Sequence, residues 1–330
     1  MKKLLATLLL LSLTLFAFVS CGDDPAPSEP EAQTMRIGYL TGPTGVGMAK
    51  LINDYKDVEN AKYTFKNYKT DQTAAMGELL TGKIDAICLP TNVAAKYYKA
   101  QNENCYVLAI NTLNTLFFIT DSSEALTSLS DLNGKTVYTC SNGTPKIILE
   151  ALLEKANVNA TVKTEVNGQN IVTPDDLRAQ IIAGNVNIAF APEPIISAAK
   201  AARQKDGLTP YDVDLNCDTL WKQNFTGELA MGCLVVSSEF ADKNPNFITT
   251  FLSEYEASIN YISNSANIDS AASYVADAGI LPSLPVAKSA ITNLGDSIDL
   301  IIGSDMKNVL EDFYEVINEP LPDRYFYYEN

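Results

Sequence analysis

A twelve-residue pattern occurs twice in the chain and limits the folds that it can adopt. The copies are residues 79–90 (LLTGKIDAICLP) and 181–192 (IIAGNVNIAFAP). In each copy an apolar pair precedes a glycine suited to the C-terminal cap of a helix, and a short apolar strand then runs into a proline. The pattern predicts a helix, a turn, a buried strand and a loop in both halves of the chain.

A loop containing glycine also follows an apolar strand in each half. Residues 35–40 precede the loop 41–47, residues 135–140 precede the loop 141–145, and both loops lead into apolar helical runs. Such loops lie at the carboxyl edge of a parallel sheet, where open α/β sheets bind ligands. We therefore expect an α/β protein with two lobes that face one cleft. The alternative is that the helix–glycine–strand units are merely those common to any α/β chain.

The N-terminus has the features of an export signal. Residues 1–20 combine two lysines, an apolar run and a terminal Ser20, which is typical of a cleaved signal peptide. The apolar run is shorter than the roughly 20 residues that span a membrane. Ser20-Cys21 resembles a bacterial lipoprotein box, so we expect lipid on Cys21, with ordinary secretion as the alternative. Residues 21–34, rich in Pro, Glu, Asp and Ala, are expected to form a tether.

Charge and composition exclude several classes of function. The chain carries a formal charge of −16, and without residues 1–20 it has 22 basic and 40 acidic residues, a charge of −18. Nucleic acid and acidic lipid are poor partners for that charge. The chain contains no histidine, which removes Ser-His and Cys-His catalysis and the commonest metal ligand. We expect no catalytic residues, no cofactor and no metal site; a disulfide stays open, since its connectivity is not readable from sequence.

Several short segments resemble a known family. The chain is similar to ABC-transporter solute-binding lipoproteins of the group that binds sulfonates, nitrate and thiamine-pyrimidine precursors. The segments that carry the resemblance are 42–48 (GPTGVGM), 89–92 (LPTN), 109–113 (AINTL), 131–135 (DLNGK), 192–194 (PEP), 231–233 (MGC) and 322–328 (PDRYFYY).

The resemblance implies the type II periplasmic-binding-protein fold. In that fold each lobe is a mostly parallel sheet flanked by helices, and two crossing strands join the lobes. Residues 35–119 and 231–330 would form lobe one, and residues 120–230 would form lobe two. The hinge is then expected near residues 120 and 230.

Seven residues of lobe one are candidate ligand contacts because they lie in or beside the expected strand-end loops. Glycines let the backbone approach a ligand, and the following helix start offers N–H groups. The spacing G-x-x-G-x-G fits neither a dinucleotide fingerprint nor a phosphate loop. Threonine and asparagine there could instead only cap helices, and a tyrosine could stack on a flat ligand. The candidates are Tyr39, Gly42, Thr44, Gly45, Thr91, Asn92 and Asn111.

Four candidates lie in lobe two. Ser141, Asn142 and Thr144 supply hydroxyl and amide groups just before a helix that begins near residue 145. Glu193 stands between two prolines that would fix the direction of its carboxylate. A Glu193 that faces the cleft would favour an amine, amidine or aminopyrimidine group, whereas the loop 41–47 suits an anion. The alternative is a solvent-exposed Glu193, and the ligand stays undecided.

Two further patterns are interpreted as packing. The aromatic and aliphatic residues Phe247, Phe251, Tyr255, Ile259 and Ile262 recur every three or four positions, which predicts the buried face of a helix. The single tryptophan, Trp221, is expected in the core. The aromatic tail 325–328 is expected to pack on lobe one.

Together these features predict an extracytoplasmic solute-binding lipoprotein of an ABC importer. It would capture a small polar or heteroaromatic nutrient by hinge closure and pass it to a permease with a cytoplasmic ATPase. We expect a monomer in the cell envelope, held to the membrane through Cys21 and facing the periplasm or the exterior. The alternatives are a sensory or adhesive lipoprotein and an enzyme on the same scaffold.

Overall fold

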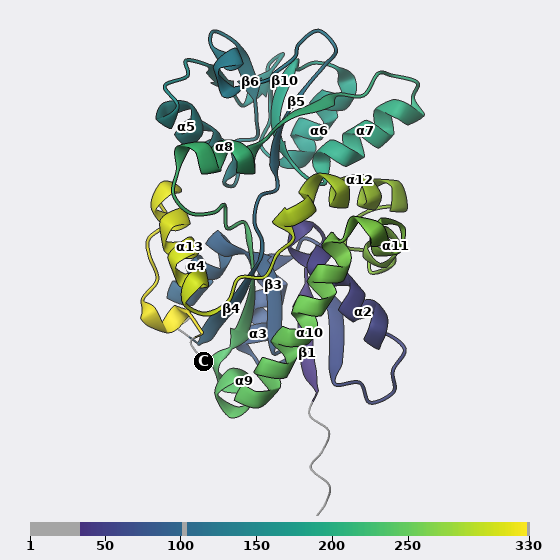
Figure 1. The fold of residues 1–330 in the computed structure, drawn as a ribbon, viewed down its shortest axis with the longest axis vertical. Coiled ribbons are helices and arrows are strands. Elements are labelled where there is room, and N and C mark those ends of the chain that lie inside the picture. Colours follow the sequence, from purple (N-terminus) through teal and green to yellow (C-terminus); the bar gives the residue numbers. More distant parts are fainter. Residues whose placement is uncertain (1–33, 101–103, 329–330) are drawn as a thin grey trace, which may run out of the picture. The chain divides into compact units, whose positions relative to one another are not determined.

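The computed structural model describes residues 34–100 and 104–328. The predicted signal peptide, Cys21 and all but the last residue of the predicted tether lie outside that part of the chain. Within it the fold is α/β, with two five-stranded sheets and helices packed on both (Figure 1). We call the first sheet and its helices lobe one, and the second sheet and its helices lobe two.

The sheet of lobe one has the strand order β2-β1-β3-β12-β4. β1 is parallel to β2 and β3, whereas β12 is antiparallel to both of its neighbours. The strands are β1 (Met35–Tyr39), β2 (Tyr63–Asn67), β3 (Ala86–Pro90), β4 (Cys105–Thr112) and β12 (Gly232–Ser237).

The sheet of lobe two has the order β11-β5-β10-β6-β7, and here β5 is the strand that opposes its neighbours. Its strands are β5 (Leu116–Thr120), β6 (Thr136–Tyr138), β7 (Thr161–Lys163), β10 (Ile188–Pro192) and β11 (Asp212–Asn216); a separate hairpin joins β8 (Glu165–Val166) to β9 (Gln169–Asn170). The antiparallel strand of each sheet therefore comes from a segment that follows a strand of the other sheet: β5 follows β4, and β12 follows β11 and α8. These two connections are the places where the chain crosses between the lobes.

The first crossing lies earlier than expected. β4 ends at Thr112 in one sheet and β5 begins at Leu116 in the other, so the chain passes between the lobes at residues 113–115. The return crossing lies just before β12. The polar residues after 120, which were expected to mark the lobe boundary, instead end β5. Polar residues lie at the crossing as well, namely Asn114 and Thr115, but they are buried and only three residues separate the two strands, so composition does not distinguish this break from the one after Thr120.

The helices of lobe one come mainly from the C-terminal part of the chain (Figure 1). They are η1 (Pro43–Met48), α2 (Ala49–Tyr55), α3 (Gln72–Leu80), α4 (Thr91–Ala100), α9 (Ser238–Lys243), α10 (Pro245–Ser263), η3 (Ser265–Asn267), α11 (Ile268–Asp277), α12 (Leu284–Leu294), η4 (Gly295–Ser297), α13 (Gly303–Val316) and η5 (Arg324–Phe326). The predicted apolar stripe lies on α10, where Phe251, Tyr255 and Ile259 are buried, which confirms its role in packing. The aromatic tail also packs on lobe one, since Tyr327 pairs with Val107 of β4.

The helices of lobe two flank a smaller sheet. They are η2 (Leu129–Leu132), α5 (Pro145–Lys155), α6 (Pro174–Ala183), α7 (Ile195–Lys205) and α8 (Cys217–Asn224). Trp221 on α8 is buried, as predicted, and contacts Phe313 of α13 with 6.3 Å between ring centroids. None of the helices in residues 34–100 and 104–328 is both long and apolar enough to cross a bilayer.

The repeated sequence pattern forms the predicted structure in both lobes. In one copy α3 ends before Gly82, whose φ is 65°, and β3 follows. In the other copy α6 ends at its C-cap Gly184, with φ 72° and a left-handed conformation, and β10 follows. A positive φ is the conformation that glycine adopts without steric cost. The two copies therefore place Pro90 and Pro192 at the carboxyl ends of equivalent strands.

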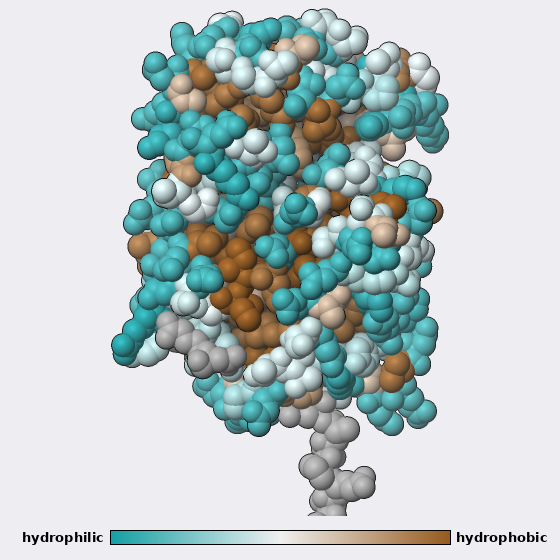
Figure 2. Space-filling view, viewed as in Figure 1, coloured by the Kyte–Doolittle hydropathy of each residue, from teal (hydrophilic) through white to brown (hydrophobic). Residues whose placement is uncertain are grey.

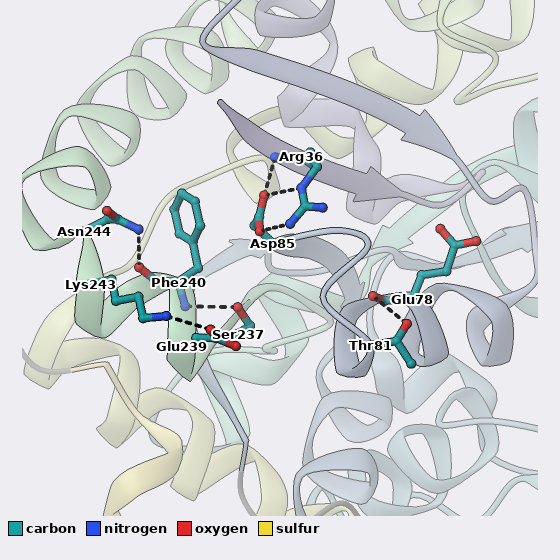
Figure 3. A network of polar contacts seen from close by, with 9 residues as sticks. All are labelled: Arg36, Glu78, Thr81, Asp85, Ser237, Glu239, Phe240, Lys243 and Asn244. Atoms are coloured by element: carbon teal, nitrogen blue, oxygen red, sulfur yellow. Dashed lines mark hydrogen bonds and ion pairs between the residues drawn. The ribbon is translucent and has the colours of Figure 1, made fainter. Parts of the chain in front are cut away.

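The opposite edge of the first sheet is held by an ion pair (Figure 3). The carboxylate of Asp85, just before β3, is buried and accepts hydrogen bonds from the backbone N–H and side-chain nitrogens of Arg36 on β1, at 2.6–2.9 Å. The Asp85 carbonyl also accepts from the N–H of Ser237, the last residue of β12. This edge joins three strands and lies at the amino end of β1 and β3, away from the loops expected to bind a ligand.

Apolar side chains connect the two lobes. One cluster of buried residues continues from Leu89 of β3 through Leu113 and Leu116 at the crossing to Phe190 of β10. On the face shown in Figure 2, apolar residues gather in the lower half of the view, with hydrophilic residues around them. The crossing is therefore packed like a core and is not a loose linker.

Candidate functional site

A cavity of about 560 Å³ lies between the carboxyl edges of the two sheets. Both lobes line it, and Thr115 of the first crossing lies between them. Lobe one contributes Pro43, Thr44, Gln72, Pro90, Asn92, Val93, Lys96, Met231, Ile317 and Glu319, and lobe two contributes Asn142, Gly143, Thr144, Pro145, Ile147 and Pro174. Its size and mixed lining suit a small molecule.

Four helices begin at this cavity. The first or second residues of α3, α4, α5 and α6 line it, namely Gln72, Asn92, Pro145 and Pro174. A helix N-terminus carries partial positive charge and free N–H groups. Two of these helix starts are already satisfied by acidic side chains, whereas the start of α5 is preceded by Thr144, which makes no side-chain cap.

The acidic caps belong to α3 and α6. Asp71 accepts a hydrogen bond from the N–H of Ala74 at 2.9 Å. Asp176 accepts from the N–H and hydroxyl of Thr173, and these bonds hold the pKa of Asp176 below its ordinary value. The Asp176 carboxylate is thereby favoured in its ionised form, and the N–H of Asp176 donates in turn to the Thr173 hydroxyl at 3.2 Å, so both helix starts already have partners. The starts of α4 and α5, one from each lobe, have no such acidic side chain in their first turn.

Lys96 and Glu319 are the charged residues of the lining, within the part of the chain that the structure describes. Lys96 Nζ lies 3.6 Å from Glu319 Oε2, and the Lys96 side chain is 63% exposed. The Glu319 side chain is only 13% exposed, so the lysine is the mobile partner of this long contact, and water screens its charge. Lys96 can therefore turn toward an anionic ligand at small cost.

The loop that carries Thr44 is held rigidly from behind. The amide nitrogen of Asn111 donates to the Thr44 carbonyl and to the Tyr255 hydroxyl, both at 3.0 Å, and the Asn111 side chain is buried. A Cβ added to Gly45 would lie 2.9 Å from the Leu40 carbonyl oxygen. The loop can pass this close to β1 only because position 45 has no side chain.

Four of the predicted contact residues line the cavity. They are Thr44 and Asn92 from lobe one and Asn142 and Thr144 from lobe two. Neighbouring Ser141 is exposed, and it is not part of the lining. The structure thus brings together residues nearly a hundred positions apart, and their contact with a ligand stays a prediction.

The other candidates of lobe one lie behind the lining. The Tyr39 hydroxyl donates to the Ala278 carbonyl at 2.9 Å, and the buried Thr91 hydroxyl donates to the Ala230 carbonyl at 2.5 Å. Gly42, with φ 123°, and Gly45 shape the loop backbone. Asn111 supports the same loop. Tyr39, Thr91 and Asn111 use their polar groups on the protein itself, because segments from distant parts of the chain, such as those at Ala230 and Ala278, cover the strand ends.

Known protein families were compared with this sequence. The sequence model of the family described as NMT1/THI5 like matches residues 93–266, which is more than half of the chain. The chain belongs to this family. A search of curated protein sequences found no match.

Solved structures share the fold of this NMT1/THI5-like protein. An ABC transporter protein from Parabacteroides distasonis superposes with a TM-score of 0.69 at 18% identity, over 90% of this chain and 99% of that one. The periplasmic aliphatic sulphonate binding protein SsuA from Escherichia coli gives 0.64 at 19% identity, over 91% and 93%. The periplasmic nitrate-binding protein NrtA from Synechocystis gives 0.53 at 13% identity, over 84% and 75%. At these identities the likeness establishes the two-lobed periplasmic-binding-protein fold.

Glu193 lies elsewhere in this NMT1/THI5-like fold. Its side chain is 1% exposed and is absent from the cavity lining. Its carboxylate accepts from the Ser197 hydroxyl at 2.9 Å, the Ser197 N–H at 3.2 Å and the Asn293 amide at 2.5 Å. Burial raises the pKa of Glu193 above its ordinary value. Neither expected position, cleft-facing or solvent-exposed, matches these contacts, because α12 from lobe one covers the residue.

Several lining residues escaped the sequence analysis. Gln72 and Pro174 begin helices that follow strand-end loops, so the reasoning applied to residues 141–145 would have found them. Lys96 lies one turn along α4 from Asn92 and faces the same side. Glu319 follows the C-terminal helix α13, and no local pattern indicates that it reaches the cavity.

The cysteines in residues 34–100 and 104–328 are buried free thiols, so no disulfide forms among them. Burial raises the pKa of Cys88 and Cys105 to about 12, and these thiols stay protonated and unreactive at neutral pH. Over the same residues no group of three or more histidine, cysteine or acidic side chains could hold a metal ion.

Proposed function

We propose that this protein is the extracytoplasmic solute-binding component of an ABC importer. The observation that carries the proposal is the cavity between the lobes, which residues from both sheets and the first crossing line together. A ligand held there touches both lobes and favours their closure, which is how a hinged binding protein couples binding to shape. The named neighbours from Escherichia coli and Synechocystis, which bind sulphonate and nitrate, support this use of the fold.

The lining favours a ligand with an anionic or hydrogen-bond-accepting group. Helices α4 and α5 begin at the cavity, where the partial positive charge of a helix N-terminus favours an anion, and Asn92, Asn142 and Lys96 add side-chain donors. Val93, Ile147 and Met231 supply an apolar wall for the rest of the molecule. The argument for an aminated ring depended on Glu193 facing the cleft, and Glu193 is bound instead to Ser197 and Asn293. Among the described residues that line the cavity, Glu319 is the carboxylate.

We propose no catalytic role. The lining contains no cysteine, and the chain contains no histidine, so the usual activated nucleophiles have no base to pair with. The charged pair of the lining, Lys96 and Glu319, suits binding and charge selection.

We also propose that the mature protein is a monomer, anchored by lipid on Cys21, with residues 1–20 removed and a permease as its partner. The support for anchoring is the sequence Ser20-Cys21 after an apolar run and the polar stretch before β1. Mass spectrometry of the protein from cell membranes tests this directly. A diacylglyceryl-modified N-terminal peptide that begins at Cys21 is the expected result, and an unmodified peptide in the secreted fraction contradicts it.

The binding function is tested by native mass spectrometry of gently purified protein, followed by a thermal-shift panel of sulfonates, nitrate, carboxylates and aminopyrimidines. A ligand at about 100 times its Kd stabilises the fold by about 2.7 kcal/mol. The variant Asn142→Ala should lose most of that stabilisation, since it removes a donor from the lining. Ser141→Ala is the matched control, because this neighbour is not part of the lining. A flat panel together with no retained mass would contradict the proposal.

A further inference from the structure

The lobes touch at a second place, apart from the cavity. Helix α7 of lobe two packs against α12 of lobe one (Figure 1). A groove between them is lined by residues of these two helices and shares no residue with the cavity lining. α12 belongs to lobe one by its core, since Ala287, Ala290 and Ile291 pack with Ile37 of β1. The contact therefore spans the two lobes without touching the expected ligand.

Glu193 is the polar centre of this contact. One of its carboxylate oxygens accepts from Asn293 of α12, and the same oxygen accepts from the Ser197 hydroxyl of α7. The bond from Asn293 joins residues 100 positions apart and is the hydrogen bond that connects Glu193 to lobe one. Glu193 is also joined to the crossing, because its N–H donates to the Thr115 carbonyl at 2.8 Å. One residue thus links lobe two, the crossing and lobe one.

The chemistry of the contact makes it sensitive to movement. Every hydrogen-bond donor to the Glu193 carboxylate is neutral. Lys200 on α7 acts on it through charge alone, and Lys288 on α12, which also lines the groove, pairs with Asp269. A buried carboxylate without a cation in contact is costly unless its hydrogen bonds are complete. If α12 moves away, the carboxylate loses Asn293 and must take up water. A separation at which the carboxylate has lost Asn293 but is not yet hydrated would therefore be costly.

We propose that Glu193 and Asn293 are positioning residues that hold the lobes at the angle seen here and thereby set how far the ligand cavity opens. The Thr115 carbonyl ties this contact to the crossing, and Thr115 itself lines the cavity. A change at Glu193 thus reaches the ligand only through the position of the lobes. The inference rests on the proposed function in one respect, namely that the cavity is where a ligand binds.

The test measures the distance between the lobes without a ligand. Spin labels are placed at Ala74 on α3 and Ala179 on α6, two exposed positions on helices that begin at the cavity from opposite lobes. The labels are attached to cysteines introduced by Ala74→Cys and Ala179→Cys in the full chain. Cys21→Ser removes the cysteine at the N-terminus, and the native cysteines from residue 34 onward are buried, so the label reacts with the two introduced thiols. Double electron–electron resonance then gives the distribution of distances between the labels.

The decisive variant is Asn293→Leu, which keeps the volume and removes the donor. We expect a longer and broader distance distribution than in the parent, with the open population raised about tenfold, as for the loss of one bond to a charged acceptor. Glu193→Gln keeps an acceptor oxygen for Asn293 and should shift the distribution less. Ser289→Ala is the matched control, because Ser289 lines the same groove on α12 and makes no bond to Glu193. It should leave the distances unchanged.

The outcomes separate this inference from the proposed function. If Asn293→Leu gives the same distances as the parent, the contact does not position the lobes and the inference is wrong, whatever ligand is found. If the distances shift but no ligand in the panel binds, the contact holds the lobes and the proposed function is the part that fails. If Asn293→Leu misfolds, Asn293→Ala, which removes the same donor with a smaller side chain, decides, and an unchanged distribution there also overturns the inference.

Discussion

Asn111 offers a sharp test of the difference between supporting the binding loop and touching the ligand. The sequence placed Asn111 among the ligand contacts, whereas the structure buries it behind the loop that carries Thr44. The variant Asn111→Ala removes two donated bonds, to the Thr44 carbonyl and the Tyr255 hydroxyl, and one accepted bond, from the Thr112 hydroxyl at 3.1 Å. All these partners stay buried in the variant.

The expected loss of stability follows from those partners. Each buried polar group left without a partner costs about 1–3 kcal/mol, and a smaller side chain lets water or a rotated hydroxyl recover part of this. We expect a net destabilisation of about 2–4 kcal/mol. For a chain of this size that lowers Tm by roughly 2 °C per kcal/mol, or about 4–8 °C in calorimetry. Ligand affinity should fall as well, since the Thr44 loop loses its support.

The matched control is Asn92→Ala. Asn92 lines the cavity and is only partly buried, so its replacement should weaken binding while Tm of the ligand-free protein changes by about 1 °C or less. Calorimetry with and without ligand measures both quantities. The reasoning is refuted if Asn111→Ala unfolds at the parent temperature while binding is lost, because that pattern belongs to a residue that contacts the ligand.

Three further perturbations have defined outcomes. Asp85→Ala removes the partner of Arg36 and should destabilise the fold by about 1–2 kcal/mol, a modest loss because the Arg36 side chain is 44% exposed and water replaces part of the interaction. Chemical denaturation measures this free-energy change, and a value below about 0.5 kcal/mol would contradict the role of the ion pair at this edge. Gly45→Ala places a methyl group 2.9 Å from the Leu40 carbonyl oxygen and should destabilise the fold by about 1–3 kcal/mol and weaken ligand binding. Gly77→Ala, on α3, meets open space and should leave the stability unchanged or raise it. Equal Tm values for both variants would refute the steric argument. Because the pKa of Glu193 is raised in the folded state, its protonation stabilises the fold at pH values below its ordinary pKa, near 4.5, and this contribution is lost as the pH rises through the folded value. The stability of Glu193→Gln relative to the parent should therefore increase as the pH rises from about 4.5. A constant difference in Tm between the two proteins across that range would show that Glu193 does not titrate as its burial requires.

Local patterns predicted the elements of the fold well. The repeated helix–glycine–strand segments, the apolar stripe of α10 and the helix start at Pro145 are all found in the structure, whereas Thr91 and Asn92, considered as possible caps, are the first two residues of α4. These features depend on residues close in sequence, through capping, turn conformation and periodic burial. The crossing was expected near residue 120 because only residues 113–115 separate β4 from β5, and composition does not record which sheet a strand joins.

The candidate site was predicted only in outline. Strand-end loops led to Thr44, Asn92, Asn142 and Thr144, which do meet at the cavity. The residue types at Thr91 and Asn111 are equally suited to ligand contact and to internal hydrogen bonds, and only the surrounding chain decides between them.

The amino-acid sequence by itself determined the α/β class, the duplicated unit, the acidic charge and the absence of histidine, because each of these is a property of composition or of neighbouring residues. The tertiary structure alone decided the fate of Glu193. Its two flanking prolines limit its backbone, but the direction of its carboxylate depends on α12, which arrives about a hundred residues later and covers it. Long-range packing determines which polar groups are left for a ligand, since every buried donor and acceptor must first find a partner within the fold.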